Sequence, residues 1–250
     1  MDASREGNVM DGLFDVGGYR LYFRCEGADE PPVAMIAGGD DTHATWQGVR
    51  PEIATFARVC AYDRAGAYGG ASDESPRPSS IGQMADDLRA LLTAAGVAGP
   101  YVLVGHSSGG AAARLFADRY PDDVAGVVLL DPTPLNVMEQ SSSWREEAAA
   151  VGFDPDRMIA EMRAATGFPD VPLKVLSHDP ALGPAPGVSL SAEFEARWAQ
   201  GQRQCATLSP RGEQITVAGA YHYIHESAPR VVVAAIRDVI RAIRDADARP

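Results

Sequence analysis

Residues 101–110 read Tyr-Val-Leu-Val-Gly-His-Ser-Ser-Gly-Gly, and this stretch decides how the rest of the chain is interpreted. Its apolar half predicts a short buried strand, and the alanine-rich residues 111–120 predict a helix. Between them, Gly105-His106-Ser107-Ser108-Gly109 has the pattern Gly-x-Ser-x-Gly. Between a strand and a helix, this pattern lifts a serine hydroxyl above the end of a sheet. The sharp turn forces the serine backbone into sparsely allowed φ/ψ space, so small residues are needed on both sides.

Strands and helices alternate on both sides of this segment. Strand-like runs occur at 13–16 and 19–23, joined by a turn at Gly17-Gly18, and then at 33–36, 58–62, 126–130, 173–176 and 213–217. Helical spacing occurs at 46–56, 81–95, 191–207 and 229–245. Continuous apolar strands that alternate with helices predict an α/β fold with a mainly parallel sheet covered on both faces.

Residues 132–170 interrupt this alternation. They contain no strand-like run, and helical stretches at 144–150 and 156–165 carry Trp, Phe and Met side chains. We therefore expect a small helical cap at 132–170 and a core made of residues 1–131 and 171–250. A cap above the serine would enclose an apolar pocket.

The amino-acid composition limits the kinds of molecule that the protein is expected to bind. The 250 residues are 46% hydrophobic and carry a formal net charge of −12, with no evident basic patch. This argues against nucleic acid or an anionic membrane as a partner. No apolar run is long enough to span a bilayer, and residues 1–8 are polar with no apolar stretch behind them.

The cysteines also bear on location. Cys25, Cys60 and Cys205 are odd in number and widely spaced, which favours buried free thiols in a reducing compartment over a disulfide framework. We therefore expect a cytoplasmic protein. His222 and His225 are three residues apart, but no third ligand lies close in sequence, so no metal site is predicted.

Four blocks of sequence now resemble the α/β-hydrolase family, and in particular its small, cap-bearing esterases and lactonases. They are Ile36–Gly39 with Trp46, Ala61–Gly66 with Ser72-Asp73, Gly105–Gly109, and Ala220–Ile224. The resemblance covers residues 12–243 and implies an eight-stranded sheet and the chain order nucleophile, acid, histidine.

The resemblance implies that Ser107 is the nucleophile and His222 its base. A serine hydroxyl needs a base within hydrogen-bond reach, and His222 lies in the loop where this fold delivers its histidine. His225 on the same loop is the rival, and Tyr221 stands where the family usually has glycine. His106 is expected to pack under the turn, and His43 is a candidate substrate contact.

The acid has two candidates. The family's commoner position follows the strand after the cap and would use Asp179, and the other follows the strand at 126–130 and would use Asp131. Asp179 follows its strand more closely than the family's acid usually does, and the glycine that usually precedes the acid is missing here. We favour Asp131 as the acid and keep Asp179 as the alternative. The carboxylate that is not the acid is expected to cap a turn or a helix.

The oxyanion hole needs two backbone donors. The resemblance implies the N–H of Ser108, and the N–H of Gly39 ahead of Asp40. Ala37 replaces the histidine that usually precedes this glycine. Asp40 and Asp41 would oppose a negative charge there unless they point away or bind a substrate group.

These residues predict a serine hydrolase that cleaves a small apolar carboxylic ester or lactone through an acyl-enzyme, with no metal and no cofactor. Acyl transfer to an alcohol or amine, or C–C bond hydrolysis, would use the same triad. A non-catalytic ligand-binding protein on the same fold is the alternative from another class. Oligomeric state is not assigned.

Overall fold

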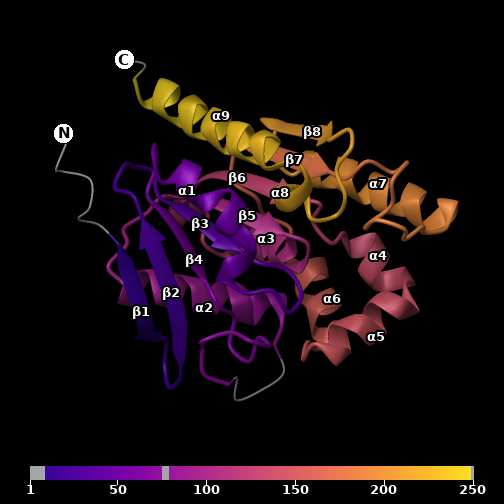
Figure 1. The fold of residues 1–250 in the computed structure, drawn as a ribbon, viewed down its shortest axis with the longest axis horizontal. Coiled ribbons are helices and arrows are strands. Elements are labelled where there is room, and N and C mark those ends of the chain that lie inside the picture. Colours follow the sequence, from indigo (N-terminus) through magenta and orange to yellow (C-terminus); the bar gives the residue numbers. More distant parts are fainter. Residues whose placement is uncertain (1–8, 75–78, 249–250) are drawn as a thin grey trace.

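The computed structural model describes residues 9–74 and 79–248, which form an eight-stranded sheet with helices on both faces (Figure 1). The strand order is β1-β2-β4-β3-β5-β6-β7-β8. β1 and β2 form an antiparallel hairpin, β2 pairs antiparallel with β4, and the remaining neighbours are parallel. The predicted mainly parallel α/β sheet is therefore confirmed. The polar segment 1–8 and part of the loop that follows β4 lie outside the described residues.

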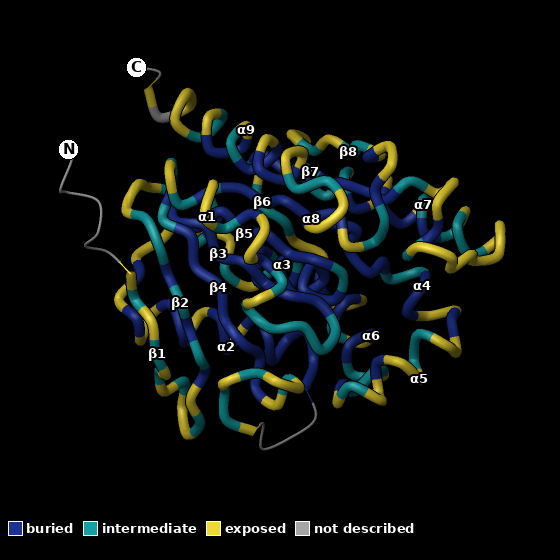
Figure 2. Tube along the Cα trace, in the orientation of Figure 1, coloured by how far each residue is buried: buried dark blue, intermediate teal, exposed yellow. Residues whose placement is uncertain are grey.

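The strands agree with the predicted runs to within a few residues. Their bounds are Met10–Asp15 (β1), Arg20–Glu26 (β2), Val33–Ile36 (β3), Val59–Tyr62 (β4), Tyr101–His106 (β5), Val124–Leu130 (β6), Leu173–Ser177 (β7) and Gly212–Thr216 (β8). The central strands β3, β4 and β5 are buried along their whole length, as their continuous apolar sequences require (Figure 2).

Alternate residues of the central strands face two separate cores. On β3, Ala34 and Ile36 join the core that α2 (Ile81–Ala94) and α3 (Ser108–Arg119) cover. Val33 and Met35 join the opposite core, which α9 (Pro229–Asp247) covers. This two-sided burial is what a parallel sheet needs, because both of its faces are apolar.

The helix predicted at 46–56 differs from the structure. A 3-10 segment at His43–Gly48 is followed by the short α1 (Arg50–Ile53), so the helical path is broken at Val49. Pro51 explains the restart, because proline lacks an N–H and is tolerated in the first helical turn.

Three helices fill the chain between β6 and β7. They are α4 (Leu135–Gln140), α5 (Ser142–Ala150) and α6 (Pro155–Ala164). The prediction that this stretch contains helices and no strand is confirmed. Backbone hydrogen bonds tie these helices to the loop before α2, where Ser79 N–H donates to Gly152 O and Asp154 N–H donates to Ser79 O. Side chains add further ties, since Glu161 of α6 accepts from Ser80 Oγ and from the N–H of Gly82. The division into a cap at 132–170 and a core at 1–131 and 171–250 stays a prediction.

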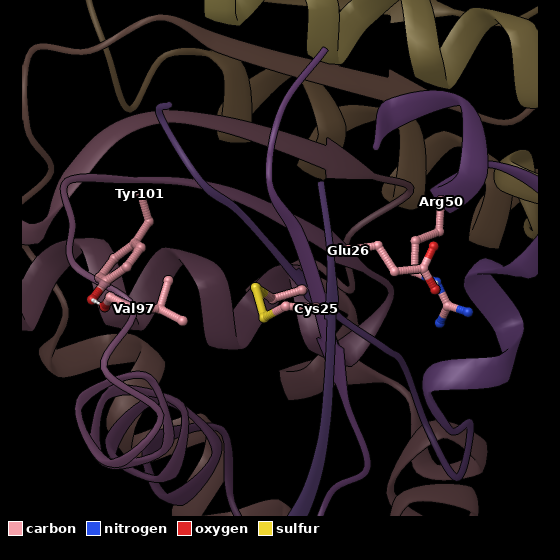
Figure 3. The surroundings of a disulfide bond; sticks show 6 residues. Cys25, Glu26, Arg50, Val97 and Tyr101 are labelled. Atoms are coloured by element: carbon pink, nitrogen blue, oxygen red, sulfur yellow. Dashed lines mark hydrogen bonds and ion pairs between the residues drawn. A yellow bond between two sulfur atoms is a disulfide. The ribbon is translucent and has the colours of Figure 1, made fainter. Parts of the chain in front are cut away.

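The cysteine prediction is wrong. Cys25 and Cys60 form a disulfide that joins β2 to β4 (Figure 3). The two residues are register partners in the antiparallel ladder, so their side chains meet on one face of the sheet. They are 35 residues apart in sequence, which says nothing about strand register. Cys205 is the free thiol, and burial raises its pKa to about 11.

The disulfide removes the argument for a reducing compartment, because disulfides persist mainly in oxidising ones. Cytoplasmic location therefore stays a prediction without that support. Within residues 9–74 and 79–248, no helix has both the length and the apolar character that a membrane crossing requires.

Candidate active site

The turn at Ser107 has the strained geometry that its sequence predicts. Ser107 has φ 54° and ψ −121° and lies between the end of β5 and the first residue of α3. A Cβ on Gly105 would lie 2.5 Å from Gly109 O, and a Cβ on Gly110 would lie 2.7 Å from Pro132. A larger residue at these glycine positions would therefore push α3 off the sheet.

The hydroxyl of Ser107 faces a cavity and has a partner that the sequence did not suggest. Its Oγ lies 3.3 Å from Thr133 Oγ1, and Thr133 N–H donates to Ser107 O. Thr133 is buried and follows directly after Asp131-Pro132. Ser107, Thr133 and His222 all line the same cavity. No motif marks a threonine here, so only the fold could reveal this contact.

His222 contacts one of the two candidate acids. Its Nδ1 lies 2.6 Å from Asp131 Oδ2. Because a carboxylate only accepts hydrogen bonds, Nδ1 carries the proton and Nε2 is the ring nitrogen that can accept one. The loop is held in place by its backbone, since His222 N–H donates to Pro184 O and His222 O lies 3.1 Å from His106 Nε2.

Asp131 is fully buried and has φ 45°. Its carboxylate meets four groups: His222 Nδ1 at 2.6 Å, His178 Nδ1 at 2.8 Å, Trp198 Nε1 at 2.8 Å and the backbone N–H of His178 at 3.3 Å. Burial by itself raises the pKa of Asp131, but the hydrogen bonds from His178 and His222 outweigh it and hold the pKa below its ordinary value. The carboxylate is therefore ionised at neutral pH.

Asp179, the other candidate, lies elsewhere. It accepts the N–H of Ala181 and of Gly219, each at 3.0 Å, and these bonds lower its pKa. This is the turn-capping role expected for the carboxylate that is not beside the histidine.

Sequence reasoning missed a second histidine at the acid. His178 Nδ1 reaches Asp131, and its Nε2 lies 3.0 Å from Glu195 Oε2. Burial lowers the pKa of His178, but the two carboxylates raise it more, to about 9. Glu195 and Trp198 both come from α7 (Ala192–Ala206), three residues apart on one helix face. That spacing was the only sequence signal available.

The loop after β3 was expected to supply an oxyanion donor, but its Gly39 N–H already has a partner. Gly39 has φ +43°, and its N–H donates to Ser108 Oγ at 2.8 Å. Ser108 is the first residue of α3, so its own N–H has no partner within the helix. Gly38 lies against the serine turn, where a Cβ would come within 2.7 Å of Ser107 Cβ. The two expected donors are thus both beside Ser107, and one of them is bonded to a hydroxyl.

The acidic residues of this loop point to other partners. Asp40 Oδ1 accepts the N–H of Tyr68 at 2.8 Å and lies 3.3 Å from Arg64 Nη2. Arg64 also donates to Gly39 O at 3.3 Å. Asp41 is partly buried, and this burial raises its pKa. The repulsion expected from Asp40 is therefore countered by a buried guanidinium.

The rival histidine and the histidine before the serine are both buried. His225 packs on Trp46 with ring centroids 4.6 Å apart, and burial lowers its pKa to about 4. Burial also lowers the pKa of His106 well below 6.5, the charge of His222 adding to the effect. Both rings are therefore neutral at neutral pH. His106 was expected to pack under the serine turn, and its ring also packs against His222, with ring centroids 4.6 Å apart.

His43 does not take the substrate-contact position suggested for it. Its Nδ1 lies 2.7 Å from Asp63 Oδ1, and its ring packs on Tyr22. Within the described part of the chain, no group of three or more His, Cys, Asp or Glu side chains is arranged to hold a metal ion.

A cavity of about 570 Å³ opens above Ser107. One wall comes from the helices between β6 and β7 and comprises Trp144, Ala148, Val151, Phe153 and Met158. The other comes from the segment before and within α7 and comprises Pro184, Val188, Leu190, Phe194 and Trp198. Among the described residues that line it there is no lysine or arginine, and the ionisable ones are Asp131, Glu147, His178 and His222.

Comparison with known proteins agrees with this architecture. A family model described as "alpha/beta hydrolase fold" matches residues 31–175. A solved thermophilic esterase from Thermogutta terrifontis superposes with a TM-score of 0.65 over 95% of this chain and 99% of that chain, at 21% sequence identity. At that identity the likeness shows the fold alone.

Two curated relatives differ in how much of them the chain covers. The chain is 34% identical over 127 residues to "Probable transporter efuK" of Hormonema carpetanum, which is 48% of this chain and 18% of that protein. It is 27% identical over 224 residues to the uncharacterized protein YqjL of Bacillus subtilis, which is 86% of this chain and 85% of YqjL. The chain thus spans less than a fifth of the first relative and most of the second.

Proposed function

The chain belongs to the α/β-hydrolase fold family, and we propose that within it this protein is a serine hydrolase that cleaves a carboxylic ester or a lactone. A fold alone does not specify a reaction. The observation that carries the proposal is the contact of 2.6 Å between His222 Nδ1 and Asp131 Oδ2, at the edge of a cavity that Ser107 also lines.

In the proposed mechanism, Ser107 Oγ attacks the carbonyl carbon while His222 Nε2 takes its proton. Asp131 holds the ring in the tautomer that leaves Nε2 free and stabilises the imidazolium that forms. His222 then gives the proton to the leaving alcohol oxygen, and an acyl-enzyme remains on Ser107. Water, deprotonated by His222, hydrolyses it. The contact of Ser107 Oγ with Thr133 Oγ1 is long, at 3.3 Å, so turning the hydroxyl towards His222 costs little.

Backbone donors would stabilise the tetrahedral intermediate. We propose the N–H groups of Ser108 and Gly39, beside the partial positive charge at the start of α3. The N–H of Gly39 donates to Ser108 Oγ in the structure, so this hydroxyl holds the place that the oxyanion would take. On this proposal the substrate oxygen displaces the hydroxyl.

The walls of the cavity favour a neutral, apolar substrate. Its lining is rich in aromatic and aliphatic side chains and has no lysine or arginine among the described residues. Both ring nitrogens of His178 are already paired with Asp131 and Glu195, so a substrate carboxylate would find no unpaired cationic partner there. We propose that residues 132–170 act as a cap whose inner face binds the acyl or alcohol part.

The test is covalent labelling. A fluorophosphonate probe should label the folded protein at Ser107, and Ser107→Ala should abolish labelling, because the probe reacts only with an activated serine. Hydrolysis of p-nitrophenyl esters of increasing chain length then reports the acyl preference. Folded wild-type protein that neither labels nor hydrolyses these esters would overturn the proposal.

A further inference from the structure

The carboxylate of Asp131 is shared between two histidines. His222 Nδ1 and His178 Nδ1 both meet the same oxygen, Oδ2, at 2.6 and 2.8 Å. The mechanism proposed above uses only His222. His178 lines the same cavity, but its Nε2 is already paired with Glu195, so it has no free ring nitrogen to serve as a base for Ser107.

The proton count at His178 follows from its partners. Asp131 is held ionised by its hydrogen bonds, and Glu195 carries a second carboxylate. Ionised carboxylates only accept hydrogen bonds, so a ring between two of them must donate from both nitrogens and is an imidazolium. The raised pKa of His178, about 9, agrees with this count. Asp131, His178 and Glu195 together thus carry one net negative charge behind His222.

The surrounding fold keeps most of the surface of Asp131, His178 and Glu195 away from solvent and holds these residues in place. His178 follows the end of β7, where Asp131 N–H donates to Leu176 O, so the two residues sit on neighbouring strand ends. The His178 side chain is 4% exposed and that of Glu195 is 14% exposed. Charges with so little solvent around them are weakly screened, and a change of one unit is felt at a neighbouring ring.

We propose that His178 is a positioning residue that, together with Glu195, sets the net charge behind His222 and with it the pH at which the site becomes active. This inference rests on the proposed function, because it assumes that His222 is the base for Ser107. Asp131 contributes most to keeping His178 charged and Glu195 adds to it, so His178 stays protonated near neutral pH when Glu195 is neutral. The positive charge of His178 offsets one of the two carboxylates that lie behind His222.

Several other groups lie near the two rings and must be separated from this effect. Those close to His222 are Asp41 and His106 from other segments, and Tyr223 and His225 from the residues that follow it in the chain. Asp179 lies near His178. His106 and His225 are neutral near neutral pH because burial lowers their pKa, and burial raises the pKa of Tyr223 to about 12. All of these residues are present in the variants at His178 and Glu195, so the variants differ from the wild type only at the replaced side chains.

Three variants test the charge balance. His178→Asn removes the positive charge, and the asparagine amide can replace the Nδ1 donor. The net charge of residues 131, 178 and 195 therefore becomes more negative by one unit. Glu195→Gln removes one negative charge and keeps the shape. The double variant H178N/E195Q restores the original net charge. The matched control is His43→Asn, which removes a histidine paired with a different buried aspartate, Asp63, away from Asp131.

The readout is the rate of fluorophosphonate labelling of Ser107 between about pH 5 and about pH 9, whose acid limb reports protonation of the base. We expect the limb to move up by about one pH unit or more in H178N, and down by a similar amount in E195Q. The double variant and H43N should stay near the wild type. Thermal melting of each variant checks folding.

Each outcome of the labelling experiment has one interpretation. Coincident acid limbs in all variants, with or without a uniform fall in rate, would overturn the inference and leave the hydrolase proposal intact. A limb that moves in H178N and does not return in the double variant would assign the effect to packing, and would also overturn it. Wild-type protein that does not label at all would instead overturn the proposed function.

Discussion

The nucleophile side and the acid side of this site are built in opposite ways. Ser107 is presented by one continuous segment, β5, a turn and α3, whose geometry depends on glycines within five residues of it. The acid side joins Asp131 after β6, His178 after β7, Glu195 on α7 and His222 after β8. A local sequence motif therefore predicts the nucleophile side, whereas the acid side forms only when the sheet is assembled.

The two sides also differ in solvent and charge. Ser107 opens onto the cavity and its hydroxyl has one long contact, whereas Asp131 is fully buried with four groups on its carboxylate. A buried charge tolerates no missing partner, while a hydroxyl at a cavity can exchange partners at little cost. Apart from replacement of Ser107 itself, which removes the proposed nucleophile, substitutions should therefore be most damaging on the acid side.

The largest expected effect comes from the acid itself. Asp131→Asn should lower kcat by about 10⁴-fold, because an amide no longer enforces the His222 tautomer or stabilises the imidazolium. Asp179→Asn is the matched control, since Asp179 is half-buried and caps a turn away from His222. Its kcat should stay within about threefold of the wild type. Hydrolysis of a p-nitrophenyl ester measures both, and a larger loss in D179N than in D131N would reverse the assignment.

A smaller effect concerns stability at alkaline pH. The folded-state pKa of His178, about 9, lies above its ordinary value of 6.5, so its contribution to folding is complete below about pH 6.5 and is lost as the pH rises through about 9. Within that window the free energy of unfolding should fall by at most about 1.4 kcal/mol per pH unit from this group.

Urea unfolding at a series of pH values, with His178→Asn beside the wild type, measures this contribution. The variant lacks the titrating ring, so its stability should change less over the same window. Equal slopes for the two proteins would show that His178 does not carry the charge assigned to it.

The smallest expected effect lies on the nucleophile side. Ser108→Ala removes the hydroxyl that accepts the N–H of Gly39 and leaves both backbone donors in place. We expect kcat/KM to stay within about threefold of the wild type, whereas loss of a true oxyanion donor costs about 10²–10³-fold. A loss of that size would show that the Ser108 hydroxyl is itself a donor to the oxyanion. Ser143→Ala is the matched control, because it removes another serine hydroxyl from the lining of the same cavity.

Much of the fold was predictable because its signals are local. Continuous apolar strands, helical spacing and the glycines around Ser107 are each contained in a few consecutive residues, and the number of strands followed from the family resemblance. The break at Val49 was missed because helical spacing continues through it and only the proline two residues later marks the restart. The pairing of Cys25 with Cys60 was missed because it depends on the register between two strands.

The site was predictable only in part, for the same physical reason. Sequence pattern named Ser107, His222 and the pair of candidate acids, and left Asp131 and Asp179 unresolved. It gave no sign of Thr133 at the serine or of His178 and Glu195 behind the acid. Histidines and carboxylates are common, and nothing in a residue's neighbours along the chain reports which buried charge it will meet.

By itself, then, the sequence determined the strained serine turn, the alternating elements and the mainly parallel sheet, because each depends on backbone preferences and apolar spacing over a few residues. The tertiary structure alone decided which aspartate meets His222, 91 residues away, and that His178, 47 residues from Asp131, shares the same oxygen. Those contacts form only where the ends of separate parallel strands meet at one edge of the sheet, and burial there makes each unpaired charge too costly to leave without a partner.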